Sequence, residues 1–321
     1  MNRSILTKAT TAAAAAALLA ACANSSNGDE DGEGGIPGRV SIVVPFGAGG
    51  SLDTNARIMA ECLKENTDSN WVVENREGGG GTTGVNYVLD ADSDGSTVGY
   101  ISSSGIALTP LQVDDAEYAM EDILPLTIVT GAPSVIVTAG DSPHESLDDL
   151  LDSNGDDHTL ATTGALGVYQ LVASRLAEES DVRAVPFDDA AAATTAALGS
   201  NADAAILELS DSLLEYVNGG ELRALGTGAD EPVESIPDAE TFGEAGHDLP
   251  ISTNYGVFVG SRDLPQETQD ALNEAFTKCA ADDKVIDRIG EQFVLDPVLT
   301  TDPAEDLLQE ARAGYEAALG E

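Results

Sequence analysis

The fold is decided by the stretch Val44-Pro45-Phe46-Gly47-Ala48-Gly49-Gly50-Ser51-Leu52-Asp53. Before it, apolar residues alternate along 40–44, which predicts a β-strand that ends at the proline. After it, apolar residues recur at helical spacing along 52–63, which predicts a helix. The glycine-rich segment therefore connects the carboxyl end of a strand to the amino end of a helix.

The same alternation of strands and helices continues along the chain. Further strands are expected at 71–73, 97–101, 126–139 with a break at 131–133, near 159, and at 182–185, 203–207, 222–225 and 255–259. Further helices are expected at about 167–178, 189–198, 212–217, 265–280, 284–289 and 303–319. For the last helix we expect Asp302 as N-cap, Pro303 at the first helical position and Glu305 as capping-box partner.

This alternation predicts an α/β protein whose mostly parallel sheets are flanked by helices. About 285 residues exceed one comfortable core, so we expect two lobes. The chain has 57 Asp and Glu against 14 Lys and Arg, and a formal net charge of −43. Such a surface repels nucleic acid and anionic lipid, so neither is expected as a partner. Because 42% of the residues are hydrophobic, the composition does not predict disorder.

The N-terminus is typical of a secretory signal peptide, expected over residues 1–21. Arg3 and Lys8 precede an apolar run that is too short for a confident membrane span. The run ends in Leu-Ala-Ala-Cys at 19–22, which resembles the bacterial lipobox and predicts a lipidated Cys22. The alternative is a plain alanine-rich signal with a chance cysteine. Residues 22–35 are small, polar and acidic, which predicts a flexible tether.

Two cysteines, Cys62 and Cys279, remain in the mature chain. In an oxidising compartment an even remainder is usually paired. Both residues fall on predicted helices, so a disulfide requires those helices to be adjacent. Two buried thiols are the alternative.

A second glycine-rich loop follows the strand at 71–73 and runs through Gly78-Gly79-Gly80-Gly81. A loop of this kind at a helix N-terminus directs several free N–H groups at one spot, with the helix dipole behind them. Because ligands of parallel α/β sheets sit at the carboxyl ends of strands, both loops are candidate anion sites. Tight strand-to-helix turns are the alternative reading. Neither loop matches a P-loop or the dinucleotide fingerprint.

These loops resemble the solute-binding receptors of tripartite tricarboxylate transporters. The resemblance lies in residues 44–57, in 73–76 with the glycine run, and in Asp-Gly-Ser-Thr at 94–97. It continues in order through 160–164, 185–187, 197–203, 218–225 and 255–258. It implies a two-lobed periplasmic-binding-protein fold of type II, with lobe 1 formed by 36–131 plus 255–321 and lobe 2 by 132–254.

The resemblance also implies that the ligand's carboxylate is held between the lobes by backbone amides and ordered water. Carried over, the expected ligand-binding residues of lobe 1 are Phe46, Gly47, Ala48, Gly49, Gly50, Ser51, Asp53, Gly79, Gly80 and Gly81. Ser102 and Ser103 are added as hydroxyl donors because they follow the strand expected at 97–101. Those of lobe 2 are Thr162, Thr163, Gly164, Phe187, Asp188 and Glu208. Asp53 is expected to fix the loop and the helix start, since its charge would repel an anion.

The chain departs from the family where its members carry Gly-Ser and His, because it has Leu-Gly-Val-Tyr-Gln at 166–170. It also has Asp188-Asp189 where many members have Lys-Gly. The distal part of the ligand therefore meets an altered, acidic environment, and a smaller or amphoteric carboxylate fits it as well as citrate does. The alternative for the two aspartates is a solvated helix N-cap pair.

An enzyme is not expected, because His144, His158 and His247 lie in polar segments without ligand-like spacing. No cofactor or metal is predicted. We expect a monomeric receptor, anchored by its lipid outside the cell membrane, that delivers a small organic acid to integral-membrane transporter subunits. A soluble periplasmic or secreted form is the alternative location. A receptor that signals through a membrane sensor is the alternative function.

The composition predicts adaptation to salt, because screening shortens the reach of charge repulsion to about 3 Å at 1 M. An ordinary acidic secreted protein is the alternative. We expect the melting temperature to rise with NaCl from about 0.1 M to about 3 M, measured by circular dichroism. A melting temperature that falls steadily with NaCl contradicts the prediction.

Overall fold

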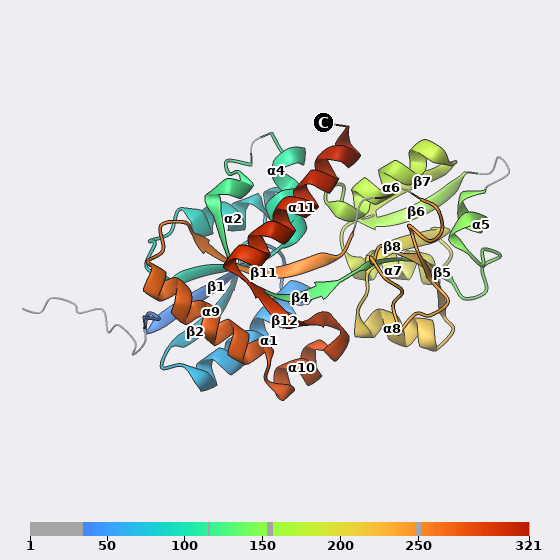
Figure 1. The fold of residues 1–321 in the computed structure, drawn as a ribbon. Coiled ribbons are helices and arrows are strands. Elements are labelled where there is room, and N and C mark those ends of the chain that lie inside the picture. The colour runs from blue at the N-terminus through green and yellow to red at the C-terminus, as the bar shows by residue number, and fades with distance from the viewer. Residues whose placement is uncertain (1–34, 115, 153–156, 248, 250–251, 321) are drawn as a thin grey trace, which may run out of the picture.

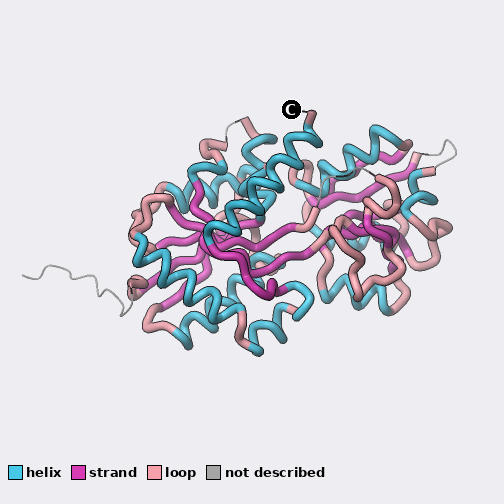
Figure 2. Tube along the Cα trace, in the orientation of Figure 1, coloured by secondary structure: helices cyan, strands magenta, loops and turns pink. Residues whose placement is uncertain are grey.

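The computed structural model describes residues 35–114, 116–152, 157–247, 249 and 252–320. The signal peptide at 1–21, the lipidation site Cys22 and all of the tether except Gly35 lie outside these residues. Two six-stranded sheets form two lobes that lie side by side, with helices covering the sheets (Figures 1 and 2). The expected α/β class is confirmed.

The first sheet contains the strand that was predicted ahead of the glycine-rich stretch. In hydrogen-bonded order it consists of β12 (Val294–Thr300), β4 (Ile123–Ala132), β11 (Asn254–Ser261), β3 (Thr97–Ser102), β1 (Arg39–Val44) and β2 (Asn70–Asn75). Strands β1, β2, β3 and β4 share one direction, and β11 and β12 run against them. The helical segments of this lobe are α1 (Ser51–Asn66), η1 (Gly79–Gly81), α2 (Thr82–Leu89), α3 (Ser103–Ala107), α4 (Thr109–Gln112), η2 (Met120–Asp122), α9 (Gln266–Ala280), α10 (Asp283–Ile289), η3 (Glu291–Phe293) and α11 (Thr301–Leu319).

The second sheet is built from a continuous stretch of chain. Its order is β10 (Glu240–Thr241), β9 (Leu222–Thr227), β5 (Ser134–Ala139), β8 (Ala204–Glu208), β6 (His158–Thr163) and β7 (Val182–Phe187). Within this sheet β5 runs against the other strands. Its helices are α5 (Leu147–Leu151), α6 (Val168–Glu179), α7 (Ala190–Leu198) and α8 (Asp211–Asn218). Both sheets are therefore mixed: three of the five neighbouring pairs are antiparallel in the first sheet and two of the five in the second, so the expected mostly parallel pairing holds only for the second sheet.

The chain passes between the lobes on two adjacent strands. Strand β4 ends at Ala132 and β5 starts after Pro133, which is the break expected near 131–133. The returning strand β11 begins at Asn254, which pairs with Ala132. Figure 1 shows β4 in green and β11 in orange between the two sheets. The two lobes thus share a short antiparallel junction.

The core of the first lobe is a row of aromatic rings. Trp71 of β2 meets Phe276 of α9 edge to face at 5.9 Å, and Phe276 stacks on Phe258 of β11 at 3.9 Å. Tyr100 of β3 follows at 4.7 Å from Phe258. Aromatic residues make up only 4% of the chain, so this row concentrates a scarce source of buried apolar area where α9 meets the sheet.

The last helix starts earlier than expected. Helix α11 begins at Thr301 with Thr300 as N-cap, and no side chain caps it. The expectation that Asp302 is the N-cap is therefore wrong. Glu305 pairs with Arg262 at 2.9 Å instead of completing a capping box. The expectation that Pro303 is the first helical position is also wrong, because it is the third. It still lies within the first turn, where a backbone N–H has no helical partner to lose.

Strand β12 was missed by the sequence analysis. It lies at the edge of the first sheet, contains Pro297, and shifts register between Val294 and Leu299. Proline is tolerated on edge strands because its missing N–H faces away from the neighbouring strand. A proline inside a short apolar run argues against a strand when only the sequence is read.

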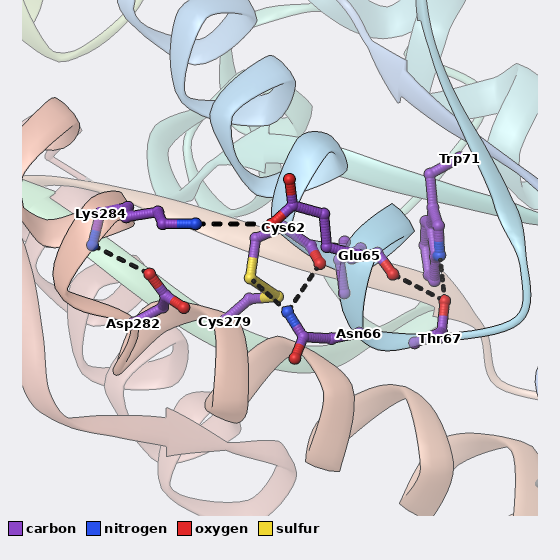
Figure 3. Close-up of a disulfide and its surroundings, with 9 residues drawn as sticks. Cys62, Glu65, Asn66, Thr67, Trp71, Cys279, Asp282 and Lys284 are labelled. Atoms are coloured by element: carbon purple, nitrogen blue, oxygen red, sulfur yellow. Dashed lines mark hydrogen bonds and ion pairs between the residues drawn. A yellow bond between two sulfur atoms is a disulfide. The ribbon is translucent and has the colours of Figure 1, made fainter.

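A disulfide joins Cys62 of α1 to Cys279 of α9 (Figure 3). The two Cα atoms are 5.8 Å apart and 217 residues separate the cysteines. Both side chains are buried among the core residues of the first lobe. The bond therefore ties the beginning of the described chain to its last quarter.

Replacing both cysteines with serine is expected to lower the free energy of unfolding by about 2–5 kcal/mol, because the bond closes a very long loop. Denaturant unfolding at fixed salt measures the loss. The matched control is wild-type protein with a reductant, which should unfold like the double variant. Two free thiols in denatured, unreduced wild-type protein contradict the bond.

Candidate functional site

The two glycine-rich loops lie at the carboxyl ends of neighbouring strands. Strand β1 pairs in parallel with both β2 and β3. The loop 45–50 therefore leaves the same sheet edge as the loop 76–81, and α3 starts there as well. In the second lobe, the parallel strands β6, β7 and β8 end at Thr163, Phe187 and Glu208. These are the strand ends at which the ligand-binding residues were expected.

The first loop is held by the carboxylate of Asp53, which is 3% exposed. Its Oδ2 accepts hydrogen bonds from the Gly49 N–H at 2.9 Å and from Arg57 Nε at 3.0 Å. Its Oδ1 accepts one from Asn75 Nδ2 at 2.9 Å, and Arg57 also lies 2.8 Å from this oxygen. Asp53 therefore fixes the loop from within, and the Gly49 N–H is already occupied.

Asn75 extends this network to the second loop. Its Nδ2 donates to the carbonyl of Phe46 at 2.9 Å, and its Oδ1 accepts from Arg57 at 3.0 Å. Arg57 and Asn75 were quoted as parts of motifs but given no role by the sequence analysis. The Asp-to-Arg spacing of four residues on one helix was the available signal.

The network determines the protonation of Asp53. Burial alone would raise its pKa, but hydrogen bonds from Arg57, the Gly49 N–H and Asn75 outweigh burial, so the pKa lies below its ordinary value of 3.8. The carboxylate stays charged wherever the protein is folded at neutral pH, and its charge is matched by Arg57.

The glycines of the second loop are required by its shape. The backbone φ angles of Gly78, Gly79, Gly80 and Gly81 are all positive, between 59° and 132°, a conformation that L side chains rarely adopt. Nearby, a Cβ on Gly84 would lie 2.7 Å from Pro45. Close contact between the two loops therefore needs glycine at this position.

Helix α1 begins at Ser51, directly after the first loop. Its N-cap residue is Gly50, and no side chain caps the helix. The first N–H groups of an α-helix have no intrahelical acceptor, and the helix dipole places partial positive charge there. Phe46, Ala48, Gly49, Gly50 and Ser51 are exposed around this terminus. The arrangement can hold an anion without a basic side chain.

The two lobes meet across these loops. The Gly167 N–H of the second lobe donates to Gln112 Oε1 at 2.8 Å. A Cβ on Gly80 would lie 3.5 Å from Leu166 Cδ1. Ser51 approaches Glu208 from the other lobe and partly offsets the effect of burial, which raises the pKa of that carboxyl. Ser51, Gly80 and Glu208, three of the predicted residues, are thus at the junction of the lobes.

Other predicted residues have their side chains engaged within the protein. Ser102 Oγ caps α3 by accepting from the Gly105 N–H at 3.1 Å. Ser103 is fully buried, and its Oγ accepts from the Tyr255 N–H at 3.0 Å. Thr162 is buried and donates to Gln170 Oε1 at 2.9 Å. Their hydroxyls support the strand ends, and their contact with a ligand stays a prediction.

Two predicted residues, Phe187 and Asp188, lie at the end of β7 and directly after it. Phe187 lines a cavity of about 590 Å³ together with Asp189 and residues of α7. Asp188 is exposed, and Asp189 caps α7 by accepting from the Ala192 N–H at 2.8 Å. A second cavity, of about 460 Å³, lies beside Pro133 and Phe293 and contains none of the predicted residues. Thr163 and Gly164 are half-buried, and the Gly164 N–H donates to the Phe187 carbonyl at 2.8 Å.

Within the described part of the chain, no group of three or more His, Cys, Asp or Glu side chains is arranged to hold a metal ion. In that same part, no helix is both long and apolar enough to cross a bilayer.

Known proteins of similar sequence span most of this chain. A protein from the tcbD-tcbE intergenic region of Pseudomonas sp. (strain P51) is 28% identical over 259 residues, covering 78% of this chain and 76% of the relative. Protein BugT of Bordetella pertussis is 25% identical over 274 residues and covers 82% of both chains.

Solved structures share the fold. The periplasmic binding protein BugD superposes with a TM-score of 0.76 at 24% identity, covering 88% of this chain and 96% of its own. MatC of Rhodopseudomonas palustris with bound malate superposes with a TM-score of 0.72 at 22% identity, covering 88% and 98%. R. palustris Rpa4515 with adipate gives a TM-score of 0.76 at 22% identity, covering 88% and 96%.

The family model described as the tripartite tricarboxylate transporter family receptor, TctC, matches residues 55–310. The match covers most of both lobes and includes Arg57, Asn75 and Glu208. The chain therefore belongs to this family of extracytoplasmic solute-binding receptors.

Proposed function

We propose that this protein captures a small carboxylate between its two lobes and delivers it to a tripartite tricarboxylate-type transporter. The uncapped N-terminus of α1, framed by the two glycine-rich loops, carries this proposal. It offers backbone N–H donors and a favourable dipole, which suit a carboxylate. Two solved structures that share the fold contain malate and adipate, which supports a carboxylate here as well.

The proposal assigns a division of work to the loops. Within residues 47–51 and 79–81, backbone N–H groups other than those of Gly49 and Gly81 bind the ligand's carboxylate, together with the Ser51 hydroxyl. The N–H groups of Gly49 and Gly81 donate inside the protein, to Asp53 and to the Gly78 carbonyl. Asp53, Arg57 and Asn75 position these groups without touching the ligand. When the lobes close, the rest of the ligand is bound by the strand ends of the second lobe, at 162–164, 187–188 and Glu208. Closure is then a population shift whose size equals the ligand's differential affinity for the closed form.

The lobe limits of this proposal are 36–131 plus 255–321, and 132–254. The first and second sheets draw their strands from these ranges, except that β4 ends one residue late and β11 starts one residue early. We propose that the receptor acts as a monomer that Cys22 anchors to the outer face of the membrane through lipid. We also propose that its acidic surface is an adaptation to salt.

A ligand screen tests the function. Succinate, malate, adipate and citrate are added at about 3 M NaCl and pH 7, and the melting temperature is recorded. A ligand at about 100 times its Kd stabilises the folded state by about 2.7 kcal/mol, so at least one carboxylate should raise the melting temperature by several degrees. The controls are the matched uncharged amides. If no carboxylate has an effect beyond its amide, the proposed function is wrong.

Replacing Asp53 with Asn tests the positioning network. The variant keeps the shape but removes the charge that pairs with Arg57, so we expect a stability loss of about 1–3 kcal/mol. We expect carboxylate affinity to fall on the order of tenfold, which corresponds to about 1.4 kcal/mol. Asp68→Asn, at an exposed position on the same lobe, is the matched control. If Asp53→Asn has the stability and the carboxylate affinity of wild-type protein, Asp53 does not position the loop as proposed.

The pH dependence of the same variant gives a second readout. Because the pKa of folded Asp53 lies below 3.8, its stabilising effect is complete above pH of about 4 and is lost as pH falls through the folded-state pKa. The stability difference between wild type and Asp53→Asn should therefore shrink on acidification, as followed by urea unfolding. A difference that grows at low pH contradicts the sign.

A further inference from the structure

Glu208 is an acidic side chain placed opposite the anion site. It is the last residue of β8 and is half-buried at the junction of the lobes. Its Oε2 accepts hydrogen bonds from Tyr169 Oη and from Asn254 Nδ2, each at 3.3 Å. Ser51, the first residue of α1, approaches it from the other lobe. All three donors are neutral.

Within the part of the chain that the structure describes, no cationic side chain pairs with this carboxylate. Among the ion pairs of the described residues, none includes Glu208. Burial raises the pKa of Glu208, hydrogen bonds from Ser51, Asn254 and Tyr169 offset this only in part, and no basic side chain contributes. A carboxylate taken from water without a cationic partner is costly. A bound cation would remove that cost.

The surroundings are organised to present the carboxylate. Asn254 Oδ1 accepts hydrogen bonds from the hydroxyls of Ser103 at 3.4 Å and Ser104 at 3.1 Å. This orients the amide so that Nδ2 faces Glu208. Tyr169 is held on the other side by its place in α6. Glu208 is thus aimed by neighbours from α6 and β11 and is not a freely moving surface group.

We propose that Glu208 binds the cationic group of the ligand, so that the substrate class of this receptor is a short amino carboxylate. The inference rests on the proposed function, because the ligand's carboxylate occupies the N-terminus of α1. The ammonium group then lies against Glu208. Ser51 belongs to the helix terminus and also reaches Glu208, so the two charged ends of the ligand are close together. A second carboxylate at that place would meet a like charge.

The ligand comparison uses pairs in which an ammonium replaces one carboxylate on the same carbon chain. The pairs are succinate with β-alanine, and glutarate with 4-aminobutanoate. Aspartate is added to test an α-amino group beside two carboxylates. Affinities are measured by calorimetry at pH 7 and about 3 M NaCl, a salt level that screens the distant surface. We expect wild-type protein to bind at least one amino carboxylate at least tenfold more tightly than its matched dicarboxylate.

The variant comparison uses Glu208→Gln, which keeps size and hydrogen bonding but removes the charge. We expect its affinity for the preferred amino carboxylate to fall at least tenfold, while its affinity for the matched dicarboxylate stays equal or rises. Glu215→Gln, at an exposed position of α8 in the same lobe, is the matched control and should leave both affinities unchanged. Melting curves establish that each variant is folded, and the preference of wild-type protein is a readout that needs no variant.

The outcomes separate this inference from the proposed function. If wild-type protein binds dicarboxylates as tightly as their amino counterparts, the inference fails and the carboxylate receptor stands. If Glu208→Gln tightens binding of both members of a pair, Glu208 competes for the anion site and the inference fails. An amino carboxylate preference that survives Glu208→Gln also overturns it. If neither member of any pair binds, the inference fails, and the screen of succinate, malate, adipate and citrate decides the proposed function separately.

Discussion

The carboxylate of Asp53 holds the first lobe's ligand-facing edge together. It accepts from the backbone of Gly49, from Arg57 one helical turn away, and from Asn75 at the end of the neighbouring strand. Through Asn75 the same network reaches the carbonyl of Phe46. Two loops that lie more than twenty residues apart in the sequence are thereby one structure. The open N-terminus of α1 keeps its position because the charge beside it is already matched inside the protein.

Much of the fold was predictable because the spacing of apolar residues along the sequence indicates which face of a strand or helix is buried. The alternation at 40–44 gave β1, the helical stripe at 52–63 gave α1, and the apolar run broken at 131–133 gave β4 and β5. Strand β12 was missed because Pro297 interrupts it, which is tolerated only at an edge that the sequence does not reveal. The short helices α3 and α4 were missed because they are too brief to show a period.

The location of the loops in the site was predictable from the sequence, but the hydrogen-bond partners of the side chains were less so. Glycine runs and strand ends are local signals, and they placed residues 47–51 and 79–81 at one sheet edge. The roles of side chains depend on partners far away in the sequence. Ser103 finds its acceptor and donor in Asn254 and Tyr255, about 150 residues later, and only the packing of α3 on β11 brings them together. Asp188 was predicted at a position where the chain departs from its family, and it lies exposed just before the N-cap of α7.

The acidic residues of the chain fall into two groups, those on the exposed surface and those buried near the lobe junction. Most of the charge of −43 lies on a surface that salt can screen. The carboxylates of Asp53 and Glu208 lie at the lobe junction or beneath it, where screening is weaker. Asp53 has Arg57 as partner and Glu208 has neutral donors only. The net charge is therefore mainly a property of the screened surface, whereas the behaviour of Asp53 and Glu208 depends on their burial and on their hydrogen-bond partners.

Because β11 lies in the middle of the first sheet, it constrains the order in which the parts of this lobe can fold. Strand β3 and strand β4 do not pair with each other, because β11 lies between them. Until residues 254–261 lie between them, β3 and β4 each have an unpaired backbone edge. The second sheet comes from one continuous stretch and needs no such insertion. The lobe that carries the glycine-rich loops is thus complete only after the second lobe's residues have been made, and Cys62 on α1 can form its disulfide only after Cys279 has followed.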